Sequence, residues 1–287
     1  MRNALTVDVE EWFQVCRAER YVPRATWNRL ESRLRPSLER LLRLFEARRV
    51  RATFFVLGFV AERTPGAVSD IASAGHEIGL HGHSHERADD QGPERFESDL
   101  VRGMESVGRL APAPIRGYRA PEWSLTRRTP WAFEILAAHA FDYDSSYLPL
   151  RLGVGNGLAR RPHVVKTARG PVVEMPLSTF GSDVVHGPLG NGTAVRLLPG
   201  RFVARRIAAL NHSGVPAVLC VHPWEMDPGQ PRIRLPLFRG AAHYVRLGAL
   251  RGKLDALLER FEWTAMGEVV KEVRGRIVAG GVSSGET

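Results

Sequence analysis

The sequence predicts an α/β protein with a parallel sheet assembled from strand–helix–strand units. Short runs of β-branched and aromatic residues alternate along the chain with helical segments of about 10–15 residues. The chain has 287 residues, of which 44% are hydrophobic and 25% are charged, as in globular proteins. Because α/β barrels of this length commonly form one domain, we expect a single domain over residues 1–275. The small, polar residues 276–287 are expected to be disordered.

The individual elements follow from local patterns, taken in order. Strands are predicted where apolar residues run together, at residues 4–9, 52–58, 77–80, 115–119, 141–144, 172–176 and 216–221. Helices are predicted where apolar residues recur every three or four positions, at residues 35–48, 60–74, 96–110, 129–139, 202–211 and 241–261, followed by a last short helix. Residues 149–170 and 180–192 lack such periodicity and are expected to be loops, the second one lining a cleft.

The charge and the cysteine content exclude several classes of protein. The net charge of +9 comes almost entirely from arginines that are spread along the chain without a basic block, so we expect no nucleic-acid partner. A polyanionic or membrane-proximal environment, or simple composition bias, accounts for this charge. No apolar run is long enough to cross a membrane, and the first residues lack a signal-peptide pattern, so a cytoplasmic protein is expected. Two cysteines, Cys16 and Cys220, do not make a disulfide framework.

A pair of histidines follows the strand predicted at residues 77–80. His81 and His85 are four residues apart, and one turn of helix would place both on the same face. Imidazole nitrogens bind zinc at about 2.0–2.1 Å, and such sites usually need a third protein ligand, often a carboxylate. The alternative is a solvated loop in which histidines cluster by chance.

Two acids at the end of the first strand could complete such a site. Side chains alternate along a strand, so Asp8 and Glu10 share one face and Glu11 takes the other. Two carboxylates on one face of a buried strand repel each other unless a cation or a proton lies between them. If the strand ended before them, both acids would instead be solvated.

Further polar residues follow other predicted strands, and the carboxyl ends of parallel strands form the active site of many α/β proteins. Arg119 could hold a carboxylate with its planar guanidinium, or be a surface charge. His222 could line a pocket beside Trp224, or be a satisfied core residue. Asp144 could be catalytic, or only cap a turn with the serines that follow it. Together these residues suit metal-assisted hydrolysis, in which a carboxylate takes a proton from water and a histidinium donates one to the leaving amine.

Six stretches in this order resemble the NodB-type polysaccharide deacetylases, carbohydrate esterase family four. They are residues 6–10, 52–58, 75–85, 119–123, 143–146 and 219–222. Residues 174–179, 222–228 and the segment around His243 resemble the subfamily associated with exopolysaccharide and exosortase gene clusters, in which a C-terminal extension covers about residues 172–275. The resemblance therefore covers nearly the whole chain.

This resemblance implies a distorted (β/α) barrel of seven or eight strands that removes an N-acetyl group from an amino sugar in a glycan or glycoconjugate. It implies a divalent metal, Zn²⁺ or else Co²⁺ or Ni²⁺. By position, Asp8 matches the general base, Arg119 the residue that orients it, and His222 the general acid. His81 and His85 match metal ligands. The backbone N–H of Glu122 matches the oxyanion contact.

One position departs from the family pattern, because many members have two adjacent aspartates in the first motif. Here Val9 follows Asp8, so Glu10 is expected to be the third metal ligand, with Glu11 as the less favoured substitute. Trp12, Trp123 and Trp224 flank the motifs and could stack on sugar rings or only pack the rim. A hydrolase of small amides or imides, as in allantoinase-like relatives, and a non-catalytic glycan-binding relative are the alternatives. The sequence leaves the sugar and the oligomeric state open.

Overall fold

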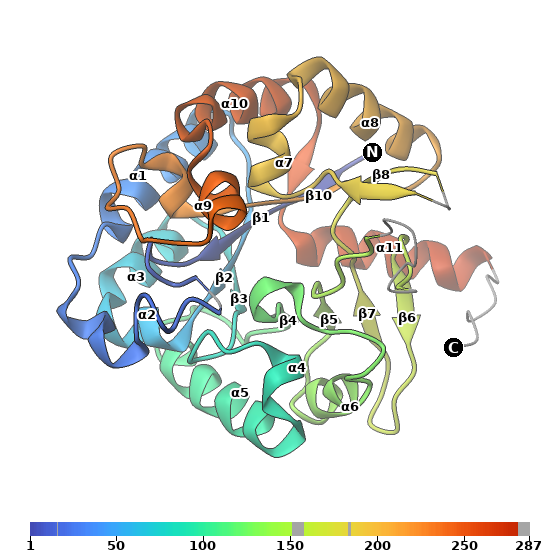
Figure 1. Ribbon diagram of the computed structural model, residues 1–287. Helices are drawn as coiled ribbons and strands as arrows, with labels where there is room; N and C mark the ends of the chain where they lie inside the picture. Colours follow the sequence, from blue (N-terminus) through green and yellow to red (C-terminus); the bar gives the residue numbers. More distant parts are fainter. Residues whose placement is uncertain (16, 151–157, 183–184, 281–287) are drawn as a thin grey trace.

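The computed structural model describes residues 1–15, 17–150, 158–182 and 185–280, so Cys16 lies outside the described residues. Within them, one curled sheet has the strand order β10-β1-β2-β3-β4-β5-β7-β6, and β11 pairs with β1 (Figure 1). All neighbours are parallel except β6 and β7. The strands are β1 (Asn3–Val9), β2 (Thr53–Val56), β3 (Glu77–Leu80), β4 (Gly117–Tyr118), β5 (Tyr143–Asp144), β6 (His163–Val165), β7 (Val172–Glu174), β10 (Val218–Val221) and β11 (Trp263–Thr264). The α/β class expected from the sequence is confirmed, and the expected distorted barrel of seven or eight strands is a curled half-barrel with nine strands in the described residues.

Most of the helices cover the outer face of this half-barrel (Figure 1). The helices are α1 (Leu34–Ala47), α2 (Gly58–Arg63), α3 (Pro65–Ser73), α4 (Ala88–Gln91), α5 (Pro93–Gly108), α6 (Trp131–Ala138), α7 (Gly192–Leu197), α8 (Gly200–His212), α9 (Leu237–Tyr244), α10 (Leu250–Arg260) and α11 (Met266–Gly280), the last of which packs on the inner face. Short 3-10 turns are η1 (Arg24–Arg29), η2 (Pro121–Trp123), η3 (Pro223–Met226) and η4 (Leu247–Ala249). In the described part of the chain, no helix is long and apolar enough to cross a membrane.

Strand β1 is buried on both faces, and this decides where its polar side chains point. Leu5, Val7 and Val9 pack outward in the main core beneath α1. The alternate positions, Thr6 and Asp8, therefore face the inside of the curled sheet. Inside the curled sheet, α11 packs its apolar residues against β1 and so fills part of the interior. The inner carboxyl end of β1 is thus the place where a buried polar group can reach an open pocket.

Two predicted helices are each broken in the structure. The helix expected at residues 60–74 is divided into α2 and α3 at Pro65, because the residue before a proline is disfavoured in helical geometry. Its neighbour Thr64 has φ −135° and ψ 59°. The helix expected at residues 241–261 is divided into α9, η4 and α10, and Arg246 at the break has a left-handed φ of 50°.

The regions expected to be loops contain short elements. Residues 149–170 include β6, which adds the antiparallel edge strand, while 151–157 lie outside the described residues. Residues 180–192 contribute to the hairpin of β8 (Thr179–Gly181) and β9 (His186–Pro188), and they end at the start of α7. The last helix, α11, reaches Gly280, so the expected disorder from residue 276 is wrong for the first five residues. Apolar residues at helical spacing from Met266 to Ile277 explain this, because they pack beneath the sheet; residues 281–287 lie outside the described residues.

A pair of buried carboxyl groups joins β5 to β7. Asp144 and Glu174 are register partners on these strands, and neither is exposed. Asp144 accepts hydrogen bonds from the Ser146 hydroxyl (2.6 Å) and backbone N–H (3.0 Å), and Glu174 accepts one from the Tyr147 N–H (3.0 Å). Burial and the neighbouring Asp144 carboxylate raise the pKa of Glu174 well above its usual range. Glu174 therefore holds its proton to a higher pH than an exposed glutamate does.

We expect the Glu174→Gln variant to be less sensitive to alkaline pH than the wild type. Because folding raises the pKa of Glu174, its contribution to stability is fully present below its unfolded-state pKa of about 4.3 and is lost as the pH rises through the higher folded-state value. Urea unfolding midpoints measured from acid to alkaline pH should fall in the wild type and fall less in the variant. The exposed control Glu105→Gln should follow the wild type, and identical curves for all three proteins would contradict this assignment.

Candidate active site

A buried ion pair lies at the base of the candidate site. Arg119 follows β4, is 0% exposed, and donates from Nη1 to Asp8 Oδ1 at 2.8 Å and to Thr6 Oγ1 at 2.7 Å. Its Nε and Nη2 donate to the backbone oxygen and the hydroxyl of Ser145, at 2.9 and 2.8 Å. Burial by itself raises the pKa of Asp8, but the Arg119 guanidinium together with His81 and His222 lowers it by more, so the net pKa lies below its usual value. Asp8 is thus a buried, charged carboxylate whose Oδ1 accepts a hydrogen bond from Arg119.

The two predicted histidines converge with Glu10, although their local structure is not the expected helical turn. They follow β3 in a loop in which Gly82 and His85 have φ of 72° and 55°. Nε2 of His81 and Nε2 of His85 lie 3.0 and 2.9 Å from the same Oε1 atom of Glu10. Nδ1 of His81 is 2.7 Å from the backbone oxygen of Arg119. Because a carbonyl oxygen only accepts, that Nδ1 carries a hydrogen and Nε2 is left to face Glu10.

These three side chains are a group that could hold a metal ion, since their ligand atoms lie within 4.8 Å of one another. Two imidazole nitrogens and a carboxylate oxygen are a donor set that zinc and similar metals accept. A second group, Asp8, Cys220 and His222, also meets this distance condition. However, burial raises the pKa of the Cys220 thiol well above its usual range, and a thiol must lose its proton to bind a metal. Because Cys220 keeps its proton more strongly than an ordinary thiol, the group that contains Glu10 is the better candidate for a metal site.

Glu11 is directed away from this cluster. Its carboxylate accepts hydrogen bonds from the Ser32 hydroxyl and from the Arg33 backbone N–H (3.1 Å), on the other side of the chain. Of the two acids that the sequence left open as a third ligand, only Glu10 faces the histidines. Trp224 lies beside it and donates from Nε1 to Glu10 Oε2 at 3.4 Å.

His222 lies across the pocket from the ion pair, directly after β10. Its Nε2 is 3.9 Å from both Asp8 Oδ2 and Glu10 Oε2, and its Nδ1 is 3.0 Å from Glu225 Oε2. Burial lowers the pKa of His222, but the carboxylates of Glu10, Glu225 and Asp8 outweigh it and raise that pKa to about 9. His222 is thus a histidinium at neutral pH, with a proton on the nitrogen that faces the pocket.

Two residues that hold His222 were not predicted as site residues. Glu225 also accepts the backbone N–H of His222 (3.0 Å), and its other oxygen accepts from Nε of Arg196 at 3.0 Å. The spacing of three residues between His222 and Glu225 is that of a capping box, and this was the available signal. Arg196 is fully buried on α7, and nothing in the local sequence links it to a residue so far along the chain.

The pocket has a wall on each side of this centre. Glu122 and Trp123 have left-handed φ of 52° and 50° in the turn after β4. The Glu122 carboxylate accepts from Arg87 Nη1 (2.9 Å) and from Arg239 Nη2 (3.2 Å) on α9, so an ion pair links the two walls. On the opposite wall, the Trp224 ring stacks on His243, with centroids 4.1 Å apart.

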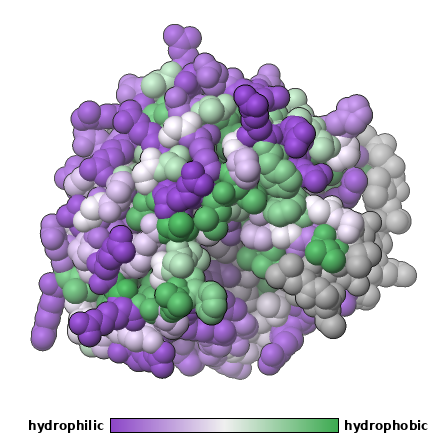
Figure 2. All heavy atoms as spheres, turned by 45° about the horizontal axis from the view of Figure 1, so that its top comes forward, coloured by the Kyte–Doolittle hydropathy of each residue, from purple (hydrophilic) through white to green (hydrophobic). Residues whose placement is uncertain are grey.

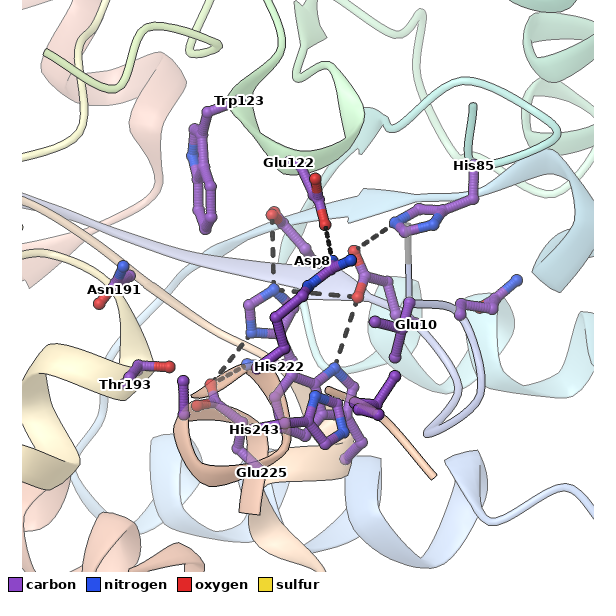
Figure 3. A pocket seen from close by; sticks show the side chains of 17 residues that line it. Asp8, Glu10, His85, Glu122, Trp123, Asn191, Thr193, His222, Glu225 and His243 are labelled. Carbon is purple, nitrogen blue, oxygen red and sulfur yellow. Dashed lines mark hydrogen bonds and ion pairs between the residues drawn. The ribbon is translucent and has the colours of Figure 1, made fainter. Parts of the chain in front are cut away.

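Figure 3 shows Asp8, Glu10 and His222 facing one cavity, with Asn191 and Thr193 at its edge. The cavity measures about 850 Å³ including its solvent-open part. Of the predicted residues, it is lined by Asp8, Glu10, His85, Glu122, Trp123, His222 and Trp224. His81, Arg119 and Asp144 do not line it, and all three are fully buried. Figure 2 shows hydrophobic residues around a hollow on one face of the molecule, with hydrophilic residues outside them.

The protein thus has an α/β fold whose pocket contains a cluster of one carboxylate and two histidines that could hold a metal ion. This cluster lies beside the buried Asp8 carboxylate and the His222 histidinium. Residues 26–141 match the family described as polysaccharide deacetylase, and residues 145–271 match a domain of unknown function, DUF3473. The polysaccharide deacetylase match includes His81, His85 and Arg119, and the second match includes His222.

One relative is similar to this chain in sequence, and two solved structures are similar to it in fold. A peptidoglycan deacetylase of Helicobacter pylori is 34% identical over 162 residues, which are 51% of this chain and 54% of that protein. The chain thus aligns with only about half of that relative. A Mycobacterium smegmatis structure described as a polysaccharide deacetylase has a TM-score of 0.63 at 21% identity, covering 100% of this chain and 94% of the other. A structure of that description from Pseudomonas aeruginosa has a TM-score of 0.59 at 14% identity, covering 95% and 90%.

We expect Arg196→Met to destabilise the protein by about 3–5 kcal/mol, because it removes one of the two cationic partners of the buried Glu225 carboxylate and the donor to the backbone oxygens of Ala242 and His243. Urea unfolding measures the change. The exposed control Arg205→Met, on α8, should change stability by less than about 0.5 kcal/mol. Adding Glu225→Gln to Arg196→Met should restore part of the loss, and an Arg196→Met protein as stable as the wild type would contradict the ion pair.

Proposed function

We propose that this protein is a metal-dependent hydrolase that removes the acetyl group from an N-acetylated amino sugar of a glycan or glycoconjugate. The observation that carries the proposal is the convergence of Glu10, His81 and His85 beside the Asp8–Arg119 ion pair and the His222 histidinium. The polysaccharide deacetylase match and the relative named as a peptidoglycan deacetylase support the substrate class.

Glu10, His81 and His85 would hold the metal. Their nitrogen and oxygen atoms suit Zn²⁺, with Co²⁺ or Ni²⁺ as alternatives. The Arg119 backbone oxygen keeps the hydrogen of His81 on Nδ1, so that Nε2 is available as a ligand. When bound there, the metal would supply Lewis-acid polarisation of the amide carbonyl.

Asp8 acts as the general base. Its Oδ1 is held by Arg119, so Oδ2 is the oxygen available to accept a proton from the attacking water. The lowered pKa keeps this carboxylate ionised at neutral pH. As the proton moves to Oδ2, the water oxygen forms a bond to the acetyl carbonyl carbon.

His222 acts as the general acid. Glu225 fixes Nδ1 and so directs Nε2 into the pocket. His222 donates the Nε2 proton to the amide nitrogen as the carbon–nitrogen bond breaks, and the products are acetate and a free amino sugar. The Glu122 backbone N–H is our candidate for the oxyanion contact. Trp123 and Trp224 line the pocket and offer aromatic faces for sugar rings.

Replacing Glu10 should weaken metal binding, whereas replacing its neighbour should not. We expect Glu10→Gln to lower the affinity for Zn²⁺ by at least about tenfold, because one anionic ligand is lost. Glu11→Gln is the matched control, since Glu11 contacts Ser32 and Arg33 instead of the histidines. Isothermal titration of the metal-free proteins with Zn²⁺ measures both affinities. If both variants lose the same Zn²⁺ affinity, Glu10 is not a metal ligand.

Replacing Asp8 should separate catalysis from metal binding. We expect Asp8→Asn to lower kcat by about 10²–10⁴-fold, the usual effect of losing a general base. Its Zn²⁺ content should stay that of the wild type. Amine release from N-acetylglucosamine oligomers gives kcat, and elemental analysis gives the metal content. If the variant loses its metal, Asp8 is a ligand, and if wild-type protein loaded with metal releases no amine, the proposed substrate class is wrong.

A further inference from the structure

Helix α9 carries an unusual pair of neighbouring side chains. Leu237 is 81% exposed and Phe238 is 89% exposed, the highest exposures among the large hydrophobic residues that the structure describes. No residue of α9 is buried. Exposed apolar residues are ordinary when they are scattered, but a neighbouring pair at the rim of a functional pocket indicates an interaction site.

The other side of α9 is firmly anchored, so this exposure is built into the fold. The buried Arg196 donates to the backbone oxygens of Ala242 and His243, both at 3.2 Å. The His243 ring stacks on Trp224 at 4.1 Å, and the Tyr244 hydroxyl accepts the backbone N–H of Ile233 at 2.7 Å. The end of α9 is thus fixed to the pocket wall, while its beginning projects Leu237 and Phe238 into solvent.

Positive charges flank the exposed pair. Arg232 and Arg234 precede it and are exposed, and neither forms an ion pair within the described ranges. Arg232 instead lies 5.3 Å over the Tyr244 ring. Arg239 Nη1 donates to the backbone oxygen of Arg17 at 3.4 Å, which places a further basic segment beside α9. We call Arg232, Arg234, Leu237 and Phe238 the α9 edge.

The chemistry of the α9 edge selects its partner. A phenylalanine and a leucine side chain offer roughly 400 Å² of apolar surface, about half of the ~800 Å² that each partner buries in a stable protein interface. The same two side chains suffice for reversible insertion into the boundary of a bilayer, provided that basic residues add attraction to anionic headgroups. Arginine suits this boundary, because its stem packs on apolar surface while its charge stays at the headgroups.

We propose that the α9 edge docks this protein reversibly on a lipid surface that carries anionic headgroups. Leu235, Arg239 and His243 of the same segment line the pocket, so docking would bring the pocket opening to the membrane. The protein would then meet glycans that are attached to lipid at that surface. The docking proposal concerns binding and does not depend on the deacetylase activity.

Co-sedimentation of the whole protein with vesicles tests the proposal. The vesicles are phosphatidylcholine alone or phosphatidylcholine mixed with phosphatidylglycerol. We expect the wild type to sediment with the mixed vesicles, to bind those of phosphatidylcholine alone about tenfold more weakly, and to be released by salt. Leu237→Ser with Phe238→Ser should weaken binding by about tenfold or more, and Arg232→Gln with Arg234→Gln by about tenfold.

The matched control is Leu197→Ser, which removes an apolar side chain that is 45% exposed on α7. It should bind vesicles like the wild type, and unfolding midpoints should be unchanged in all variants because the altered side chains are exposed. Three results would overturn the proposal. They are wild-type protein that stays in solution with anionic vesicles, an unchanged affinity of the Leu237/Phe238 double variant, and a wild-type dimer in light scattering that this double variant abolishes.

Discussion

The buried ion pair between Arg119 and Asp8 is the interaction on which the site depends. A fully buried guanidinium is tolerated only when its donors are satisfied, and here they are divided between Asp8, Thr6 and Ser145. The backbone oxygen of Arg119 also holds His81. One residue therefore fixes the relative positions of β1, β3, β4 and the chain after β5. The same contacts align the carboxylate and the proposed metal ligand.

A second buried ion pair organises the other half of the pocket. Arg196 joins Glu225, which holds His222, to the backbone at the end of α9. All of these residues belong to the stretch that matches a domain of unknown function, whereas Arg119 and His81 belong to the polysaccharide deacetylase match. The C-terminal stretch thus supplies one wall of the pocket and the histidinium that faces the carboxylates.

The surroundings of Asp8 and His222 shift the pKa values of these two groups in opposite directions. The Arg119 guanidinium, with His81 and His222, outweighs the effect of burial and keeps the pKa of Asp8 below its usual value, while three carboxylates raise that of His222 to about 9. Both groups are consequently charged at neutral pH, one ready to accept a proton and the other to donate one. Groups whose pKa values are separated in this way are typical of acid–base pairs in hydrolases.

The sequence by itself determined the features that have a local period. Alternating and helical apolar patterns predicted strands β1–β5, β7 and β10 and most helices, and the face shared by Asp8 and Glu10 followed from strand geometry. Only the tertiary structure decided which distant groups meet. Arg196 reaches Glu225, and the helix expected across Arg246 is broken, because these outcomes depend on contacts between segments far apart in the chain. Local spacing carries no information about such contacts, and burial decides whether a charge there must find a partner.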